Sequence, residues 1–251
     1  MTQEVFYLII WIWIGIGILT FLLLLKITAP YGRHSNASWG PMISNKVGWF
    51  IMELPTLIIP GIFFFTGSAE KALLSWIFYG IYTLHYIHRV FIFPFRLKTK
   101  GKKMPLVIVI MAIFFNLVNG FILGDFLGNF ANYADSWIYS LPFIAGFLIF
   151  IIGAAINISA DTKLISLRKS DPGKYQIPSG GLFNKISCPN HFGEIIEWTG
   201  YAIMMWNVAG VSFAVWTAAN LIPRAISHHK WYKEKFPDYP EKRKAFIPFM
   251  Y

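Results

Sequence analysis

Two carboxylates begin a stretch of otherwise apolar sequence, GEIIEWTGYAIMMW, at residues 193–206. They are Glu194 and Glu197, and helical spacing places them on one face with Asn190 and Tyr201. Carboxylates are costly in hydrocarbon, and they usually mark a functional site where they persist. Such groups cannot face lipid, so we expect them to face each other or a cavity.

A second polar group lies in two earlier apolar stretches. Glu53 is the only acid of the stretch 47–66. In YTLHYIHRVF, helical spacing places Tyr82, Tyr86 and Arg89 on one face, and His85 precedes Arg89 by one turn. One role for a Glu53 carboxyl in an apolar environment is a buried ion pair with Arg89.

A third polar group follows a later apolar stretch. Asn157 and Asp161 are one helical turn apart, and Arg168 lies two turns further along the same stripe. One interpretation is that the first two residues cap a helix C-terminus. An acid there opposes the helix dipole, so a bound donor group is the better interpretation.

Metal binding is a weaker interpretation of the histidines. His85 and His88 lie close together in the chain, but there are six histidines in all, and one further pair at His228 and His229. The single cysteine, Cys188, excludes a disulfide framework and a CxxC site. We therefore assign no metal.

The elements that must position these residues are membrane-spanning helices. The 251 residues are 56% hydrophobic and only 14% charged, whereas charged residues approach about a quarter of a soluble domain. The first apolar run is too long for a signal peptide and has no basic segment before it. We predict an all-α multi-pass membrane protein, a single integral membrane domain over residues 1–251, with a cytoplasmic tail at 227–251. The seven predicted transmembrane helices cover residues 5–25, 47–66, 72–95, 105–124, 137–160, 194–206 and 208–226.

The charge distribution supports this count. All of the 22 Lys and Arg except Lys71 and Arg89 lie in segments 26–46, 96–104 and 161–192 or in the C-terminal part from Arg224. Seven spans put these four basic segments on one side, which is the positive-inside pattern. The N-terminus is therefore expected outside or in the lumen and the C-terminus in the cytoplasm. The net charge of +10 follows from these loops, so we expect no nucleic-acid partner.

Seven motifs then occur in a characteristic order. They are APYGRH at 29–34, WFIMELP at 49–55, HYIHR at 85–89, INISAD at 156–161, YQIPSGGLF at 175–183, NHFGEIIEWTGYA at 190–202 and FPDYPEKRKAFIPF at 236–249. Together they strongly resemble the steroid 5α-reductase family (3-oxo-5α-steroid 4-dehydrogenases), over nearly the whole chain. Gln176 stands where family members often carry a basic residue, so no phosphate role is assigned to it.

The resemblance implies NADPH-dependent reduction of the 4,5 double bond of a 3-oxo-4-ene steroid, with hydride added at C5 and a proton at C4. Negative charge then develops on the 3-oxo oxygen, and donors aimed at it stabilise the transition state. In the matching motifs these catalytic, substrate-binding donors are Glu53 and Tyr86. Glu53 donates only when protonated, a form that burial favours. Trp49 is expected to pack against the substrate or the nicotinamide.

The resemblance also implies a cofactor site on the cytoplasmic side, covered by cytoplasmic loops. No GxGxxG motif is present, so a Rossmann fold is not expected. Amide and carboxylate groups would meet the nicotinamide and ribose, arginines the phosphates, and aromatic rings would close around the nucleotide. The expected cofactor-binding residues are Tyr31, Arg33, Arg89, Asn157, Asp161, Arg168, Tyr175, Asn190, Glu194, Arg224, His228, Tyr232 and Arg243. Glu197 is expected to support Glu194 or to order the loop.

Three alternatives stay open. An enoyl reductase acting on long-chain acyl-CoA or another lipid enone would use similar chemistry. Membrane methyltransferases that use S-adenosylmethionine share a loop, a GE…E helix and a Y…P tail in their C-terminal part. Their RHP motif before the GE helix is replaced here by SCPNHF. A non-catalytic sterol binder would not need the arginines. We expect a monomer in the lipid bilayer, either the bacterial inner membrane or the endoplasmic reticulum membrane according to source.

Overall fold

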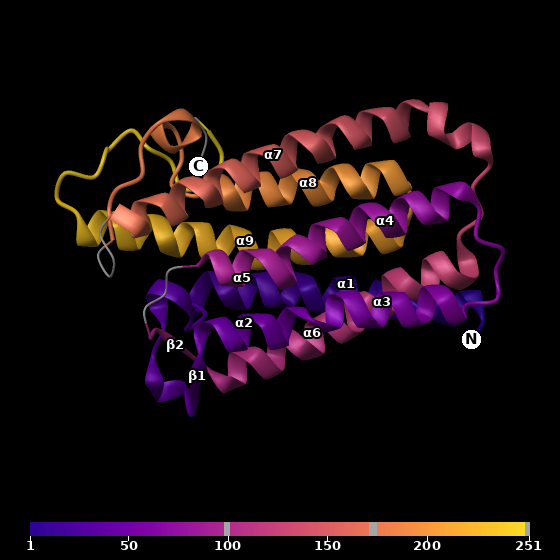
Figure 1. The fold of residues 1–251 in the computed structure, drawn as a ribbon, viewed down its shortest axis with the longest axis horizontal. Helices are drawn as coiled ribbons and strands as arrows, with labels where there is room; N and C mark the ends of the chain where they lie inside the picture. Colours follow the sequence, from indigo (N-terminus) through magenta and orange to yellow (C-terminus); the bar gives the residue numbers. More distant parts are fainter. Residues whose placement is uncertain (98–100, 171–174, 249–251) are drawn as a thin grey trace. The chain divides into compact units, whose positions relative to one another are not determined.

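The computed structural model describes residues 1–97, 101–170 and 175–248, and these are mostly helical (Figure 1). The chain forms two compact units. Unit 1 comprises Met1–Gln3 and Ala29–Ser140, and unit 2 comprises Glu4–Thr28 and Leu141–Tyr251. Lys98, Lys100 and Lys174 of the basic segments, and the side chain of Lys169, lie outside the described residues.

Unit 1 contains helices that lead away from a small two-stranded sheet (Figure 1). Its strands and α-helices are β1 (Met42–Ser44), α2 (Asn45–Glu53), α3 (Pro55–Thr66), α4 (Leu73–Ile87), α5 (Phe93–Arg96), β2 (Lys103–Pro105) and α6 (Leu106–Asp125). Two turns, His88–Ile92 and Phe126–Phe130, are π-helical. Short 3-10 helices cover Gly32–His34, Ala37–Trp39 and Asp135–Tyr139.

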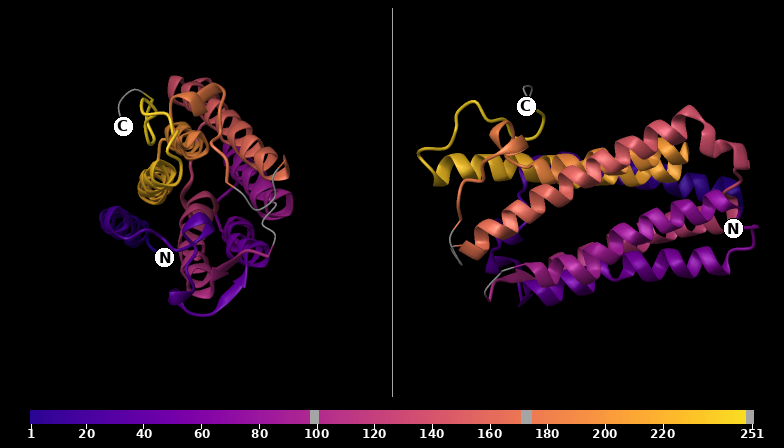
Figure 2. Two further views of the ribbon diagram at one scale, coloured as in Figure 1. Left: turned by 90° about the vertical axis from the view of Figure 1, so that its left-hand side faces the viewer. Right: turned by 45° about the horizontal axis from the view of Figure 1, so that its top comes forward.

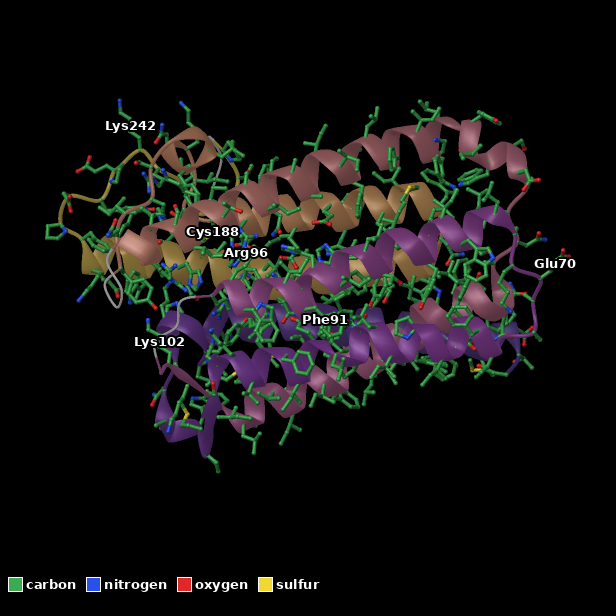
Figure 3. All side chains as sticks on the ribbon, in the orientation of Figure 1. Glu70, Phe91, Arg96, Lys102, Cys188 and Lys242 are labelled. Carbon is green, nitrogen blue, oxygen red and sulfur yellow. The ribbon has the colours of Figure 1, made fainter. Side chains whose placement is uncertain are left out.

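The sheet sets the positions of the helices in unit 1. β1 and β2 are antiparallel, with Ile43 opposite Met104. α2 and α6 each begin directly after one of these strands, and their first turns are in contact, since a Cβ on Gly48 would lie 3.2 Å from the Val109 side chain. α3 then packs against α6, where a Cβ on Gly124 would lie 2.6 Å from the carbonyl oxygen of Pro60. Figure 3 places Lys102 at the strand end of this unit and Glu70 at the opposite end of its helices.

Unit 2 contains four long helices and a loop–tail region (Figures 1 and 2). The helices are α1 (Gln3–Lys26), α7 (Leu141–Ser170), α8 (Pro189–Met205) and α9 (Val208–Lys235), and a 3-10 helix covers Gly181–Asn184. Trp206 adopts the left-handed conformation (φ 49°), and the Asn207 side chain accepts a hydrogen bond from the Ala209 N–H. This N-cap starts α9 immediately after α8 ends.

α1 joins unit 2 through an aromatic contact with α9. The Trp216 indole N–H donates to the Trp13 carbonyl at 3.0 Å, and the two ring centroids are 4.4 Å apart. Gly17 leaves room for the same indole, because a Cβ there would lie 3.1 Å from it. Much of the remaining surface of α1 exposes large apolar side chains such as Leu8, Trp11 and Leu19, which suits a lipid environment.

Several helices extend beyond the predicted spans. Within the described residues, four helical segments are long and apolar enough to cross a membrane: Gln3–Lys26, Asn45–Thr66, Leu106–Phe130 and Leu141–Arg168. The predicted count of seven is therefore not confirmed by this criterion. α7 continues through Asp161 to Ser170, so the predicted polar connection 161–192 is shorter than expected and Asp161 does not cap a helix end. α9 likewise continues into the predicted tail.

Candidate active site

Glycines on both helices bring α7 and α8 into backbone contact in unit 2. A Cβ on Gly153 would lie 2.6 Å from the Gly193 carbonyl oxygen, and one on Gly200 would lie 2.6 Å from that of Gly146. Small residues spaced this way allow helices to approach closely in a membrane. The contact explains a glycine directly before Glu194, and sequence analysis assigned these glycines no role.

The close approach joins the predicted polar residues of α7 and α8. The Asn157 amide donates to the Asn190 carbonyl at 3.0 Å and to the Glu194 carboxylate at 3.3 Å. The Asn190 amide in turn donates to the Asp161 carboxylate at 3.1 Å. Asn157 and Asp161 are buried. We call these four residues the amide–carboxylate set, and its oxygens suit the N–H and O–H groups of a carboxamide and a ribose.

Aromatic residues cluster around the loop and α9 in the same unit. The Arg168 guanidinium lies 5.7 Å from the Tyr175 ring centroid, and Tyr175 makes an edge contact with Trp231 at 4.8 Å. His228 is buried, 5.5 Å from the ring of His191. These contacts place two predicted cofactor-binding residues, Arg168 and Tyr175, beside each other.

Arg243 is the most deeply buried arginine of the predicted set. Only 3% of its surface is exposed, and its Nε and Nη1 atoms have no hydrogen-bond partner within the described part of the chain. Its guanidinium lies 4.9 Å from the Tyr239 ring centroid, and Tyr239 stacks on Tyr232 at 5.3 Å. Buried cationic N–H groups of this kind are costly unless an anion meets them. Arg243 therefore fits a phosphate-bearing cofactor.

Titrating groups surround this arginine. Burial, and then the charges of Lys233, Arg243 and Lys244, lower the pKa of His229 to about 4. Burial raises the pKa of Tyr239, although hydrogen bonds to Ser187 and Arg243 act in the opposite direction. His229 is thus neutral at physiological pH, and the positive charge here comes from the arginine and lysines. Neither the residue type nor the spacing of Ser187 and Tyr239 distinguishes them in the sequence, so they were not predicted.

In unit 1, Arg89 packs against two aromatic rings whose centroids are 5.5 Å apart. Its guanidinium lies 5.0 Å from the Trp49 centroid and 4.8 Å from the Phe93 centroid. Arg89 belongs to the π-helical turn that follows α4, so the α-helical spacing expected for it does not continue beyond Ile87. Turns of this type are frequent at functional sites. The contact brings together two residues that the motifs predicted, Trp49 and Arg89.

Tyr86 and Glu53 lie near a second tyrosine, Tyr82. The rings of Tyr82 and Tyr86 are 4.6 Å apart, and both side chains are buried. The Glu53 carboxyl is close enough to Tyr82 to act on its phenol electrostatically. Two buried phenols with a half-buried carboxyl nearby suit hydrogen bonding to a carbonyl oxygen.

A break between two helices carries Glu53. Pro55 begins α3 directly after Leu54 and has no N–H, so the turn before it loses a backbone donor. The Asn116 amide, on α6, donates to the Met52 carbonyl at 2.6 Å. The Thr56 hydroxyl donates to the carbonyl of Glu53 at 2.6 Å. Side chains thus satisfy carbonyls at the break, and Asn116 is a contributor that was not predicted from the sequence.

The remaining predicted residues are divided between the two units. In unit 1, Tyr31 packs on the cluster of Met52, Met104 and Val109, and Arg33 lies in the 3-10 helix Gly32–His34. In unit 2, Arg224 lies on α9 and Glu197 is buried on α8. The structure assigns Tyr31, Arg33 and Arg89 to unit 1 and the other predicted cofactor-binding residues to unit 2.

Comparisons with known proteins identify the relatives of this chain. A family model described as 3-oxo-5-alpha-steroid 4-dehydrogenase matches residues 102–251. The chain is 42% identical to steroid 5-alpha-reductase DET2 of Arabidopsis thaliana over 239 residues, 92% of this chain and 91% of the relative. It is 44% identical to steroid 5-alpha-reductase DET2 of Solanum lycopersicum over 92% of this chain and 91% of the relative. It is 39% identical to 3-oxo-5-alpha-steroid 4-dehydrogenase 1 of Bos taurus over 93% of this chain and 92% of the relative.

Proposed function

The chain belongs to the 3-oxo-5-alpha-steroid 4-dehydrogenase family, and on this premise we propose that it reduces the 4,5 double bond of 3-oxo-4-ene steroids with NADPH. The observation that carries the proposal is the similarity to plant and mammalian steroid reductases over about nine-tenths of both chains. An oxidoreductase acting on a CH–CH group needs a reductant, and the family implies a nicotinamide dinucleotide.

Unit 2 supplies the groups that would hold this cofactor. The amide–carboxylate set offers acceptors and donors for the carboxamide and ribose, and Arg243 offers buried N–H groups for a phosphate. Arg168 and Tyr175 would contact the nucleotide beside them, with Arg224, His228 and Tyr232 on α9. When bound, the nicotinamide supplies a hydride. A guanidinium binds phosphate oxygens through two parallel hydrogen bonds, which favours NADPH over NADH if one arginine reaches the 2′-phosphate.

Unit 1 supplies the groups that would polarise the substrate. As hydride adds at C5, the electron pair of the 4,5 double bond moves towards C3 and negative charge develops on the 3-oxo oxygen. Glu53 in its protonated form and Tyr86 would donate hydrogen bonds to that oxygen. A proton then adds at C4, the enolate returns to the ketone, and the product is the 5α-steroid. Donors of this kind act most strongly where water is excluded.

Activity assays test the substrate class. Purified protein in detergent or nanodiscs is given NADPH and, separately, a panel of 3-oxo-4-ene steroids and a long-chain enoyl-CoA, while NADPH oxidation is followed. We expect steroid-dependent oxidation with a 5α product. Oxidation that responds to enoyl-CoA and to none of the steroids would instead indicate an acyl-CoA reductase.

Variants of the carbonyl donors test the mechanism. Tyr86→Phe removes one hydroxyl, and we expect turnover to fall by about 10²–10³-fold, as on removal of an oxyanion donor. Glu53→Gln keeps a donor and the shape, so it should retain more activity than Glu53→Ala. NADPH binding should change little, because neither residue is assigned to the cofactor. If Glu53 instead serves only as the counter-ion of Arg89, Glu53→Gln should destabilise the protein and neutralising Arg89 should partly restore it.

A further inference from the structure

A buried serine hydroxyl connects three segments of unit 2. Ser187 ends the loop before α8, and only 3% of its surface is exposed. Its Oγ lies 2.6 Å from Nδ1 of His229 on α9 and 2.6 Å from the hydroxyl of Tyr239 in the tail. The same Oγ donates to the Lys244 carbonyl at 3.1 Å. A hydroxyl has one proton and two lone pairs, so these contacts use its hydrogen-bonding capacity.

The backbone reinforces this junction. The Ser187 N–H donates to the Lys244 carbonyl at 2.9 Å, and the Lys244 N–H donates to the Lys185 carbonyl at 2.9 Å. Ile186 and Lys244 thereby form an isolated parallel bridge. The tail after α9 contains no α-helix or longer strand within its described residues, and the bridge and the Ser187 hydroxyl connect it to the loop.

The junction continues to Arg243 through one aromatic ring. With the Ser187 proton donated to the Lys244 carbonyl, the Tyr239 hydroxyl donates to Ser187 Oγ. The Tyr239 ring stacks on Tyr232 with an interplanar angle of 12° and lies beneath the Arg243 guanidinium. Arg243 directly precedes the bridged Lys244 in the chain. The position of the guanidinium therefore depends on the Tyr239 ring and on the Lys244 backbone, and Ser187 holds both.

We propose that Ser187 is a positioning residue for the cofactor. Its hydroxyl fixes the tail so that the two buried N–H atoms of Arg243 are aimed at an anionic group, a phosphate of the dinucleotide. This inference rests on the proposed function, in which Arg243 binds the cofactor. Ser187 itself touches neither substrate nor cofactor. It acts through Tyr239 and the backbone of Lys244.

Removal of the hydroxyl has a specific consequence. In Ser187→Ala, the Tyr239 hydroxyl and His229 Nδ1 lose a buried partner, while the backbone bridge stays intact. The tail should then remain folded but hold Arg243 less rigidly. A ligand that needs a fixed guanidinium would have to order it on binding, so affinity for the ligand falls while the rate of the chemical step at saturation does not.

The experiment measures NADPH binding and steady-state kinetics of the full-length protein. We expect Ser187→Ala to raise the Kd for NADPH by about 10- to 100-fold, the range for a weakened hydrogen bond to a charged group. The kcat at saturating NADPH and the KM for steroid should change by less than about twofold. A contact that binds NADPH equally in the ground state and the transition state affects only the affinity for NADPH. Equal loss of kcat with an unchanged Kd would overturn the proposal.

Ser212→Ala provides a matched control. Ser212 lies on α9 in the same unit, is fully buried, and its hydroxyl has no hydrogen-bond partner within the described residues. The chemical change is identical to that in Ser187→Ala, but no hydrogen bond is lost, so NADPH affinity should stay at the wild-type value. A comparable loss of affinity in both variants would indicate a general effect of serine removal and overturn the specific role.

A double-mutant cycle identifies the route of the effect. If Ser187 acts through Arg243, then Ser187→Ala should cost little further affinity in an Arg243→Ala background. Full additivity would contradict the proposal. Where Ser187→Ala does not fold, Tyr239→Phe keeps the ring and removes its hydroxyl bonds to Ser187 and Arg243, and wild-type NADPH affinity in that variant overturns the proposal. Wild-type protein that fails to bind NADPH would refute the proposed function instead.

Discussion

Gly193→Ala tests whether the α7–α8 contact builds the amide–carboxylate set. A Cβ at this position would lie 2.5 Å from the Asn157 backbone nitrogen and 2.7 Å from the Gly153 carbonyl oxygen, whereas ordinary contact begins near 3.4 Å. The helices must therefore part by about 0.9 Å, given that packed interiors leave no slack. The Asn157 bonds to Asn190 and Glu194, at 3.0 and 3.3 Å, would lengthen beyond hydrogen-bonding range.

Thermal stability and NADPH affinity are the two properties of Gly193→Ala to measure. Overpacking of this kind costs about 1–3 kcal/mol, so the thermal midpoint of the detergent-solubilised protein should fall. Affinity for NADPH should fall by about tenfold or more, because the set loses bonds to a charged group. Gly15→Ala is the matched control, since Gly15 lies in α1 of the same unit and a Cβ there meets nothing within 4 Å. Wild-type stability and NADPH affinity in Gly193→Ala would refute the reasoning.

Three further predictions concern other parts of the chain. The pKa of His229 is about 4 in the folded protein against 6.5 unfolded, so the unfolded chain binds more protons between these values. Stability should therefore fall as pH drops from 6.5 towards 4, and this loss should be reduced in His229→Asn. Asn116→Ala should lower turnover several-fold without changing NADPH affinity, whereas Asn119→Ala, which removes a bond to the Phe115 carbonyl within α6, should leave turnover near wild type in the same assay. Cysteines introduced between the π-helical turn and the 3-10 helix, at 131–134, and in the tail should label from opposite sides of the membrane, and labelling of both from one side would contradict seven spans.

Part of the candidate site could be predicted because polar residues are rare in an apolar sequence. Asn157, Asp161, Asn190 and Glu194 stood out for this reason, and the structure joins them by hydrogen bonds. Helix ends were less predictable. The end of α7 could not be placed from hydropathy, because a helix continues into water as long as its turns remain satisfied and no glycine or proline intervenes.

Other contributors carry no such signal. Ser187 and Asn116 are ordinary polar residues in sequence, and their importance comes from partners 42 and 64 positions away. In the sequence, nothing distinguishes Gly193 from the other 19 glycines. Only the packing of α8 shows that a Cβ there would meet the backbone of α7. The π-helical turn at His88–Ile92 likewise leaves no periodic mark that distinguishes it from the α-helix before it.

The sequence by itself determined the family, the all-helical class and the kinds of side chain in the candidate site. Motifs and hydropathy are properties of residues near one another in the chain, so they can be recognised without the fold. The tertiary structure decided which of those residues meet. The α7–α8 glycine contact selects the partners of Asn157, and the tail folding back on the loop selects those of Arg243. These side-chain partners depend on close packing between segments that are distant in the chain. That packing is determined by the shapes of the side chains and by the need to satisfy buried polar groups in three dimensions.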